Sequence, residues 1–288
     1  MCIAVFAWHS HPDYPLIVAS NRDEFYTRTT RPAAWWGQQV SLLAGRDEEA
    51  GGTWLGVNRD GRFALVTNVR APTERNPHAP SRGALVVAAL QAGDDVRPWL
   101  AATAQRTQTY NGFNLLVGDA LPRQRGARRG RLGSNRTQIA PPALHYFSNR
   151  SGEASRTLAP GIYGLSNAFL DTPWPKVVRS VSAFATQVAR RVDVESLFAL
   201  LGDRELARDS ALPQTGVPLD WERVLSAVQI RANGYGTRAS TVLTVRRDGV
   251  VQFVERSFDP DDPSHFTDRR FEFVVPSVAP VASDSDGS

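Results

Sequence analysis

Two apolar runs open the chain and restrict how its N-terminal part can fold. They span residues 2–8 and 15–20, and the polar turn Ser10-His11-Pro12-Asp13 separates them. Short apolar runs on either side of such a turn are typical of a β-hairpin. The second run leads into Asn21-Arg22-Asp23-Glu24. The hairpin would therefore place a guanidinium and two carboxylates at the level where the first strand begins.

Cys2 lies at the start of that first strand and is the only cysteine in the chain. Removal of the initiator methionine, which occurs before small residues, would leave a thiol and a free α-amine on Cys2. The α-amine has a pKa near 7.7–8, about a unit below that of a free thiol, so it can accept the thiol proton. The alternative is a half-buried cysteine that packs as a small hydrophobic residue. Arg22 would favour the thiolate, and Asp23 would orient the amine.

Motifs along most of the chain resemble those of one family. They are Met1-Cys2, Asn21-Arg22-Asp23-Glu24-Phe25-Tyr26, Gly51-Gly52-Thr53-Trp54-Leu55-Gly56, Thr67-Asn68, Gly164-Leu165-Ser166-Asn167-Ala168 and Tyr235-Gly236-Thr237-Arg238. In this order the chain resembles the NRDE family, also called the transport and Golgi organisation protein 2 family, from residue 1 to about 258. That family is similar to N-terminal-nucleophile (Ntn) hydrolases of the cysteine class, such as the bile-salt and penicillin V amidases. The resemblance implies an α+β fold, a four-layer αββα sandwich.

Two asparagines are the oxyanion-binding candidates that the resemblance implies. Asn68 ends the predicted strand 62–68, where its amide can donate to a developing oxyanion or bond its own turn. Asn167 resembles the second site asparagine of the family, which would orient the substrate amide or complete the oxyanion pocket. It follows Ser166 in a stretch that nearly matches the serine-hydrolase elbow but has Ala168 where that motif has glycine. We therefore exclude Ser166 as the nucleophile.

Charged residues complete the expected site. Arg238 resembles the arginine that the cysteine Ntn amidases place beside their nucleophile, where it would stabilise the thiolate or bind an acidic substrate. The alternative for Arg238 is an ion pair with Asp23 or Glu24. In contrast with the amidases, Glu24 adds a negative charge that would raise the pKa of Cys2. The residues that we expect to contact a substrate are Asn21, Glu24 and Trp54.

Apolar periodicity predicts the remaining elements. Residues 31–37 read as an irregular segment with two adjacent tryptophans that cap a core. Residues 81–93 are predicted to form a helix, with a buried strand as the alternative because 84–90 is apolar on every side. Strands are also expected at 40–44, 53–58, 62–68, 112–118, 142–148, 160–165, 240–247 and 250–257, and helices at 95–106, 172–191, 193–202 and 221–228.

The helix predicted over 172–191 has a defined start. Thr172 is the expected N-cap, because a proline follows at the first helical position. The residues expected on its buried face are Val177, Val178, Val181 and Phe184.

Composition and charge restrict the class of protein. Of the 288 residues, 42% are hydrophobic, so we expect one domain over 1–275 with a sizeable core and a disordered tail over 276–288. The formal net charge of +4 is local, because residues 121–140 contain six arginines and no acid. This loop is a solvated connection or an anion-binding site. A local excess of this kind argues against a nucleic-acid-binding protein.

Cysteine usage and hydropathy indicate the compartment. One cysteine excludes an internal disulfide, and a nucleophilic thiol needs a reducing environment. No apolar run approaches the 18 or so residues of a membrane span, and the first residues carry no basic n-region. We therefore expect a cytoplasmic protein without stable membrane insertion. The five histidines form no ligand set, so we expect no metal and no required cofactor.

Two functions remain open from the sequence. In the first, Cys2 cleaves an amide or thioester of a small acylated substrate. In the second, the same fold carries haem or an acyl-CoA without chemistry, and a Cys2 thiolate is able to ligate haem iron. Either way the expected partner is a small acylated or haem-like molecule. The sequence does not define the oligomeric state.

Overall fold

The computed structural model describes residues 2–37, 41–125 and 138–276, and its centre is a pair of antiparallel sheets. The strands of sheet A are β1 (Cys2–Trp8), β2 (Leu16–Phe25), β12 (Gly161–Leu165), β13 (Arg231–Ala232), β14 (Tyr235–Val245), β15 (Val250–Phe258) and β16 (Phe266–Val274). They run in the order β12-β1-β2-β14-β15-β16, and β13 pairs with β14. The predicted N-terminal hairpin therefore lies inside this sheet.

Sheet B comes mainly from the first half of the chain. Its strands are β3 (Thr30–Trp36), β4 (Leu42–Asp47), β5 (Leu55–Asn58), β6 (Arg62–Asn68), β7 (Phe113–Asp119), β10 (Ala143–Ser148) and β11 (Arg156–Thr157), in the order β11-β10-β7-β6-β5-β4-β3. Two short strands, β8 (Arg123–Arg125) and β9 (Gln138–Ala140), pair with each other. Most of the arginine-rich loop, 126–137, lies outside the described residues, as do residues 277–288 of the predicted tail.

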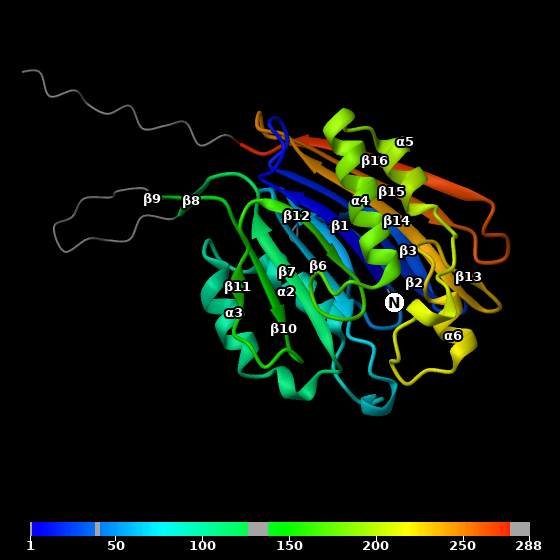
Figure 1. Cartoon of the computed structure of the whole chain (residues 1–288). Helices are drawn as coiled ribbons and strands as arrows, with labels where there is room; N and C mark the ends of the chain where they lie inside the picture. The colour runs from blue at the N-terminus through cyan, green and yellow to red at the C-terminus, as the bar shows by residue number, and fades with distance from the viewer. Residues whose placement is uncertain (1, 38–40, 126–137, 277–288) are drawn as a thin grey trace, which may run out of the picture.

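Helices cover the outer face of each sheet (Figure 1). α4 (Pro175–Arg190) and α5 (Val194–Leu201) pack on sheet A, and α2 (Arg82–Gln91) and α3 (Val96–Ala104) pack on sheet B. The remaining helices are α6 (Leu219–Val224) and three short 3-10 helices, η1 (Pro72–Glu74), η2 (Thr107–Thr109) and η3 (Asp209–Ala211). A third core fills the space between the sheets. The order of layers is αββα, which confirms the predicted fold class.

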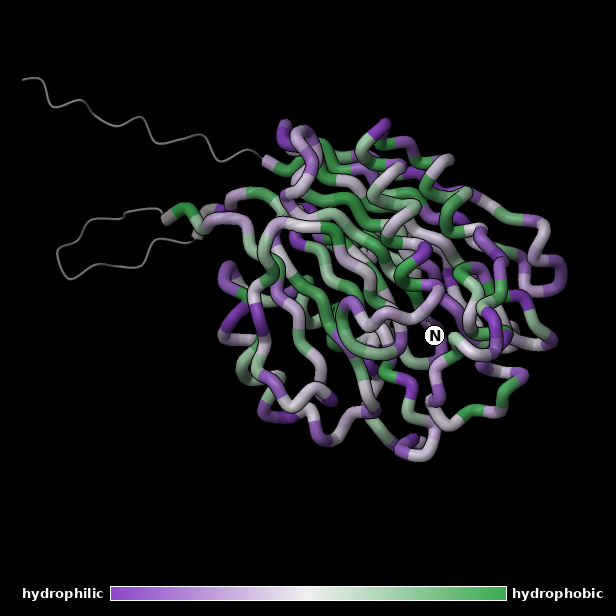
Figure 2. The backbone as a smooth tube through the Cα atoms, in the orientation of Figure 1, coloured by the Kyte–Doolittle hydropathy of each residue, from purple (hydrophilic) through white to green (hydrophobic). Residues whose placement is uncertain are grey.

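β1 shows why its sequence is a continuous apolar run. Side chains alternate between the two faces of a strand, and both faces of sheet A are covered. Phe6 and Trp8 enter the core between the sheets, whereas Ile3 and Val5 pack beneath α4 and α5. Figure 2 shows the hydrophobic colouring concentrated on such central strands and the hydrophilic colouring on the surrounding loops.

Two of the longer strands, β3 and β16, were not expected from the sequence, and neither were the short strands β8, β9, β11 and β13. Residues 30–36 form β3 rather than an irregular segment; a register shift between Arg31 and Ala34 interrupts the alternation that identifies a strand. Trp35 in this strand packs against Phe273, with ring centroids 5.2 Å apart, as expected for a residue that caps a core. The second strand, β16, pairs with β15 at the edge of sheet A and is largely exposed and charged.

The start of α4 corrects a second prediction. The helix begins at Pro175 with Trp174 at the N-cap, so Thr172 does not cap it. A residue that precedes proline is held in an extended conformation, and Trp174 has ψ 144°. On the helix itself Val177 and Phe184 are buried as predicted, but Val178 is 54% exposed. The other predicted helices and strands are present with their ends shifted by a few residues, and 81–93 is helical.

Candidate functional site

A pocket of about 860 Å³ opens at the end of the two sheets where β1 begins. Its wall comes from segments that are far apart in the sequence, since it includes Cys2, Asp23, Asn68, Arg82 and Tyr235. The register of the hairpin explains the first part of this arrangement. Cys2 pairs directly opposite Arg22, and Thr237 of β14 pairs opposite Asp23 on the other side of β2. The structure therefore brings the predicted nucleophile and the acidic motif to one pocket.

Cys2 is half-buried and faces this pocket. Burial raises the pKa of its thiol and the Asp23 carboxylate raises it further, whereas the N-terminal amine and the Arg22 guanidinium oppose them. The raised pKa keeps the proton on the sulfur at neutral pH. Attack by this thiol consequently requires a base that accepts the proton.

Asp23 is fully buried and is fixed in place by β14. Its Oδ1 accepts a hydrogen bond from the Thr237 hydroxyl at 2.7 Å, and that hydroxyl accepts one from the Ile230 N–H at 2.9 Å. Burial raises the pKa of Asp23, whereas the N-terminal amine, Lys176, Thr237 and Arg22 act in the opposite direction. The carboxylate is thus held at a defined position beside the start of β1.

Arg22 is held on the opposite face of β2, between the two sheets. Its Nη2 donates to Asp47 Oδ2 at 3.1 Å, its Nη1 donates to Thr30 Oγ1 at 3.2 Å, and the guanidinium lies over the Trp54 ring at 4.6 Å. Arg28 shares the same Asp47 oxygen at 2.8 Å. Arg22 therefore presents a fixed cation to the pocket, and Trp54 lines the pocket beneath it.

The two predicted oxyanion asparagines are adjacent but differ in access. Asn68 lines the pocket, whereas Asn167 is buried behind it. The Nδ2 of Asn167 donates to the backbone oxygen of Asn68 at 3.1 Å and to its Oδ1 at 2.9 Å. Asn167 thus orients the Asn68 amide. The neighbouring Ser166 hydroxyl donates to the Cys2 carbonyl at 3.0 Å, which is a structural role.

Arg238 lies away from the position that the resemblance implies. Its Nη1 donates to the backbone carbonyls of Phe25, Tyr26 and Arg28 at 2.9 to 3.1 Å, and it does not line the pocket. The register between β2 and β14 shifts at this residue, so a bulge directs its side chain to the turn after β2. The structure therefore gives Arg238 a role in holding that turn.

Of the three residues expected to contact a substrate, two line the pocket and one does not. Glu24 and Trp54 line the pocket. Asn21 is fully buried on the α5 side of sheet A, where its Nδ2 donates to the carbonyls of Leu201 and Val228, both at 2.9 Å. The alternation of β2 places Asn21 and Asp23 on the same face, but Asn21 lies two residues deeper in the sheet. Its contacts tie β2 to the end of α5.

The glycines before Trp54 lie where two segments of the backbone pack closely together. A Cβ atom on Gly52 would lie 2.4 Å from the backbone of Gly83, at the start of α2. Gly52 and Gly83 therefore allow the loop before β5 to contact α2 closely. The space beside these glycines is thus taken by the protein's own backbone.

Three cations near Cys2 were missed by sequence reasoning. Arg82 lines the pocket and donates to the Gly112 carbonyl at 3.1 Å; burial lowers its pKa, and Cys2 and Glu24 oppose that effect. Arg70 forms a buried ion pair with Glu222, and Lys176 lies behind Asp23. Lys176 had an available signal, because it is the only lysine in the sequence.

A cysteine at the start of a central strand of an αββα sandwich, opening into a pocket, defines a protein of the Ntn-hydrolase class of architecture. Comparison with known proteins gives the family. The family model described as Transport and Golgi organisation 2 matches residues 1–260, and the chain belongs to this family.

Relatives cover almost the whole chain. The Transport and Golgi organization protein 2 homolog of Homo sapiens is 35% identical, over 96% of this chain and all of its own length. The Transport and Golgi organization protein 2 of Drosophila melanogaster is 30% identical, over 91% of this chain and 94% of its own. The family assignment therefore covers nearly all of the chain.

The solved structures that match the chain are more distant in sequence. An N-acylethanolamine-hydrolyzing acid amidase ortholog of Caenorhabditis elegans gives a TM-score of 0.41 at 10% identity, over 84% of this chain and 92% of its own. The C2A mutant of conjugated bile acid hydrolase from Clostridium perfringens gives 0.40 at 9% identity, over 98% and 100%. Separately, none of the helices in the described part of the chain has the length and apolarity to cross a membrane.

Proposed function

We propose that this protein is an Ntn-type cysteine hydrolase that cleaves an amide or thioester of a small acylated molecule in the cytoplasm. The observation that carries the proposal is the position of Cys2, whose thiol faces a pocket of about 860 Å³ beside the fixed groups Asp23 and Arg22. A structural cysteine has no need of such a pocket. A reducing compartment would keep the thiol free.

The proposed reaction begins with removal of Met1, which frees the α-amine of Cys2. The amine takes the thiol proton as the sulfur attacks the substrate carbonyl and forms a C–S bond. Asn68, oriented by Asn167, donates to the oxyanion. The amine then returns the proton to the leaving nitrogen or sulfur as its bond to carbon breaks. Water hydrolyses the resulting thioester, which releases the acid and restores Cys2.

The raised pKa of the thiol is consistent with this sequence of steps. Because burial disfavours the thiolate, the thiol stays protonated until the base acts. Asp23, which is fixed by Thr237, would hold the α-amine in the orientation that accepts the proton. Arg22 would stabilise negative charge on sulfur as it develops.

The pocket favours a substrate with an apolar part and an acidic part. Phe25, Trp54 and Trp221 offer apolar surface, and Arg75 and Arg82 add cations to the same wall. Charge-assisted bonds from arginine to a carboxylate or phosphate contribute about 1.5–3 kcal/mol each when they are shielded from water. An acyl group linked to an acidic headgroup fits this wall.

A carrier without catalysis is the second candidate, and one observation favours it. The same burial that raises the thiol pKa makes Cys2 a poor nucleophile unless Met1 is removed. A carrier of haem or an acyl-CoA would use the arginines and aromatic residues alone. We then expect C2S to leave ligand affinity unchanged, and R82A to weaken it about fivefold or more, which is about 1 kcal/mol.

Intact mass spectrometry of the purified native-start protein tests the hydrolase. The protein is measured before and after exposure to a short-chain acyl thioester, with C2A as the control variant. We expect loss of Met1 and one acyl adduct per molecule, absent from C2A. Retained Met1, or a Cys2 that never reacts, would remove the base and its mechanism together and leave the carrier.

A further inference from the structure

The chain uses arginine for all of its strong cations except one. It contains 32 arginines and a single lysine, Lys176. Lysines normally lie at the surface, with the ammonium in water. Here the only lysine is 1% exposed, at the second position of α4. The only side-chain amine of the protein is therefore buried, whereas its other strong cations are guanidinium groups.

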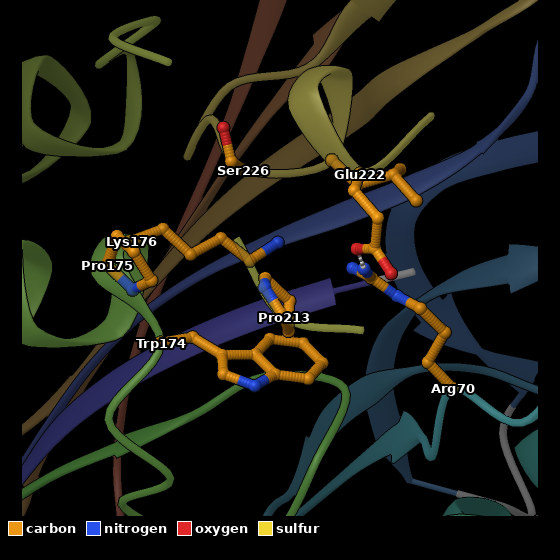
Figure 3. Close-up of a pocket in the computed structure, with 8 residues that line it drawn as sticks. Arg70, Trp174, Pro175, Lys176, Pro213, Glu222 and Ser226 are labelled. Atoms are coloured by element: carbon orange, nitrogen blue, oxygen red, sulfur yellow. Dashed lines mark hydrogen bonds and ion pairs between the residues drawn. The ribbon is translucent and has the colours of Figure 1, made fainter. Parts of the chain in front are cut away.

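Lys176 is buried at the start of α4, and α4 covers the face of sheet A toward which β2 directs Ala19 and, by alternation, Asp23. Lys176 lines a small pocket with Arg70, Trp174 and Glu222, and Figure 3 shows its side chain extending from the start of α4 toward the Arg70–Glu222 pair. The pocket has a volume of only about 10 Å³, which is close to the space that one water molecule needs. A guanidinium is larger than an amine and would not fit there without displacing its neighbours.

Titratable groups on four other segments act electrostatically on this amine. They are Asp23 on β2, Cys2 on β1, Glu222 on α6 and Arg70 after β6, and the strongest electrostatic effect comes from Asp23. Within the described residues the Nζ has no hydrogen-bond partner. Burial lowers the pKa of Lys176 to about 8, and the Asp23 carboxylate opposes that shift. The effect is mutual, because Lys176 also lowers the pKa of Asp23, second to the N-terminal amine.

We propose that Lys176 is a positioning residue that keeps Asp23 ionised, so that Asp23 can hold the α-amine of the processed Cys2. Its consequence for turnover rests on the proposed hydrolase function, whereas the coupling between Lys176 and Asp23 does not. Burial favours the neutral form of a carboxyl, and the N-terminal amine, Lys176 and Arg22 all oppose that effect on Asp23. A neutral Asp23 would not attract the amine, and the base would lose its fixed orientation.

The single lysine allows a direct measurement of the coupling. Protein labelled biosynthetically with lysine carrying ¹³C at Cε gives one side-chain resonance, which reports the protonation of Lys176 as pH is varied. In D23N we expect the titration midpoint to fall by about one pH unit or more, since the amine loses its main counter-charge. The matched control is E24Q, one residue further along β2 on the opposite face, which should leave the midpoint in place.

Two results would overturn the coupling. The first is a midpoint in D23N equal to that of the unaltered protein. The second is an equal fall in E24Q, which would show a general field effect instead of a specific pair. If D23N fails to fold, the ¹³C carboxyl resonance of Asp23 in K176M gives the reciprocal measurement. Its midpoint should rise, and an unchanged midpoint would contradict the proposal.

Acylation kinetics test the positioning role. We expect K176M to slow formation of the Cys2 acyl adduct about tenfold or more while substrate affinity is retained. In the D23N background the same substitution should have little further effect, because Lys176 acts through Asp23. If K176M slowed acylation equally in the unaltered protein and in D23N, Lys176 would not act through Asp23. Absence of any adduct in the unaltered protein would reject the hydrolase while leaving the measured coupling intact.

Discussion

Glu255 is a second buried ionisable residue, and it lies between the two sheets at 1% exposure. Its Oε1 accepts hydrogen bonds from the Ala33 N–H of β3 at 2.6 Å and from the Ser257 hydroxyl at 3.2 Å. Burial raises the pKa of Glu255 from 4.5 to about 7, although these bonds and Arg22 oppose the shift. The folded protein therefore keeps a proton that the unfolded chain releases.

The titration of Glu255 should be visible in the stability of the protein. The folded state binds more protons between pH 4.5 and about 7, so its free energy of unfolding should fall as pH rises through that window. E255Q removes the titration and should be more stable than the unaltered protein at pH 8, by up to about 3 kcal/mol.

Urea unfolding at pH 4.5 to 8 measures this effect. E153Q is the control, because Glu153 is exposed in a turn, and its curve should follow that of the unaltered protein. If the free energy of unfolding of E255Q fell with pH as steeply as that of the unaltered protein, Glu255 would not be the titrating group.

Among the elements, α4 connects the helical layer to sheet A. Its residues Val177, Phe184 and Val188 contact the same core as Ile3 and Val5 of β1. The start of α4 is set by Pro175, and the first turn carries Lys176 to its buried position. The buried face of α4 therefore packs against β1, and its first turn holds the Lys176 amine in the interior.

Two substitutions separate the buried and exposed faces of α4. F184A should lower the free energy of unfolding by about 3–5 kcal/mol, because it leaves a cavity where a fully buried ring was packed. V178A, one helical face away at 54% exposure, should change it by about 0.5 kcal/mol or less. Denaturant unfolding monitored by circular dichroism gives both values. Equal losses would contradict the assignment of the buried face.

At the scale of the whole molecule, a buried ion pair joins distant parts of the pocket wall. Arg70 follows β6 of sheet B and Glu222 lies on α6, yet their Nη1 and Oε2 atoms are 2.7 Å apart. Both side chains are 4% exposed, and the Arg70 guanidinium lies over Trp174 at 4.8 Å. The pair connects the segment after β6 to the region that leads into β14.

Removing one partner of this buried pair should lower the free energy of unfolding more than removing one partner of an exposed ion pair. E222Q leaves Arg70 buried with less compensation and should lower the free energy of unfolding by about 3 kcal/mol. D209N breaks the Arg223–Asp209 pair, which is as short at 2.6 Å but exposed, and should cost about 1 kcal/mol or less. Thermal and denaturant unfolding of the two variants measure the difference. A loss in D209N equal to that in E222Q would contradict the role assigned to burial.

Local contacts explain which parts of the fold and the site could be predicted. The β1–β2 hairpin forms between neighbouring segments, so the apolar runs and their turn were enough to place Cys2 opposite Arg22 and beside Asp23. Helices with a regular apolar period were recognised for the same reason. Strand β3 was missed because its register shift breaks the alternation, and β16 because an edge strand buries little apolar surface.

The sequence by itself determined the hairpin, the family motifs and the identity of the reactive groups near Cys2. Tertiary structure alone decided which of those groups reach the pocket. A one-residue bulge turned Arg238 away, and packing against α5 buried Asn21. The only lysine was visible in the sequence, but its place behind Asp23 depends on α4 crossing sheet A. The direction of a side chain depends on register and packing across many residues, and the residue types alone do not specify either.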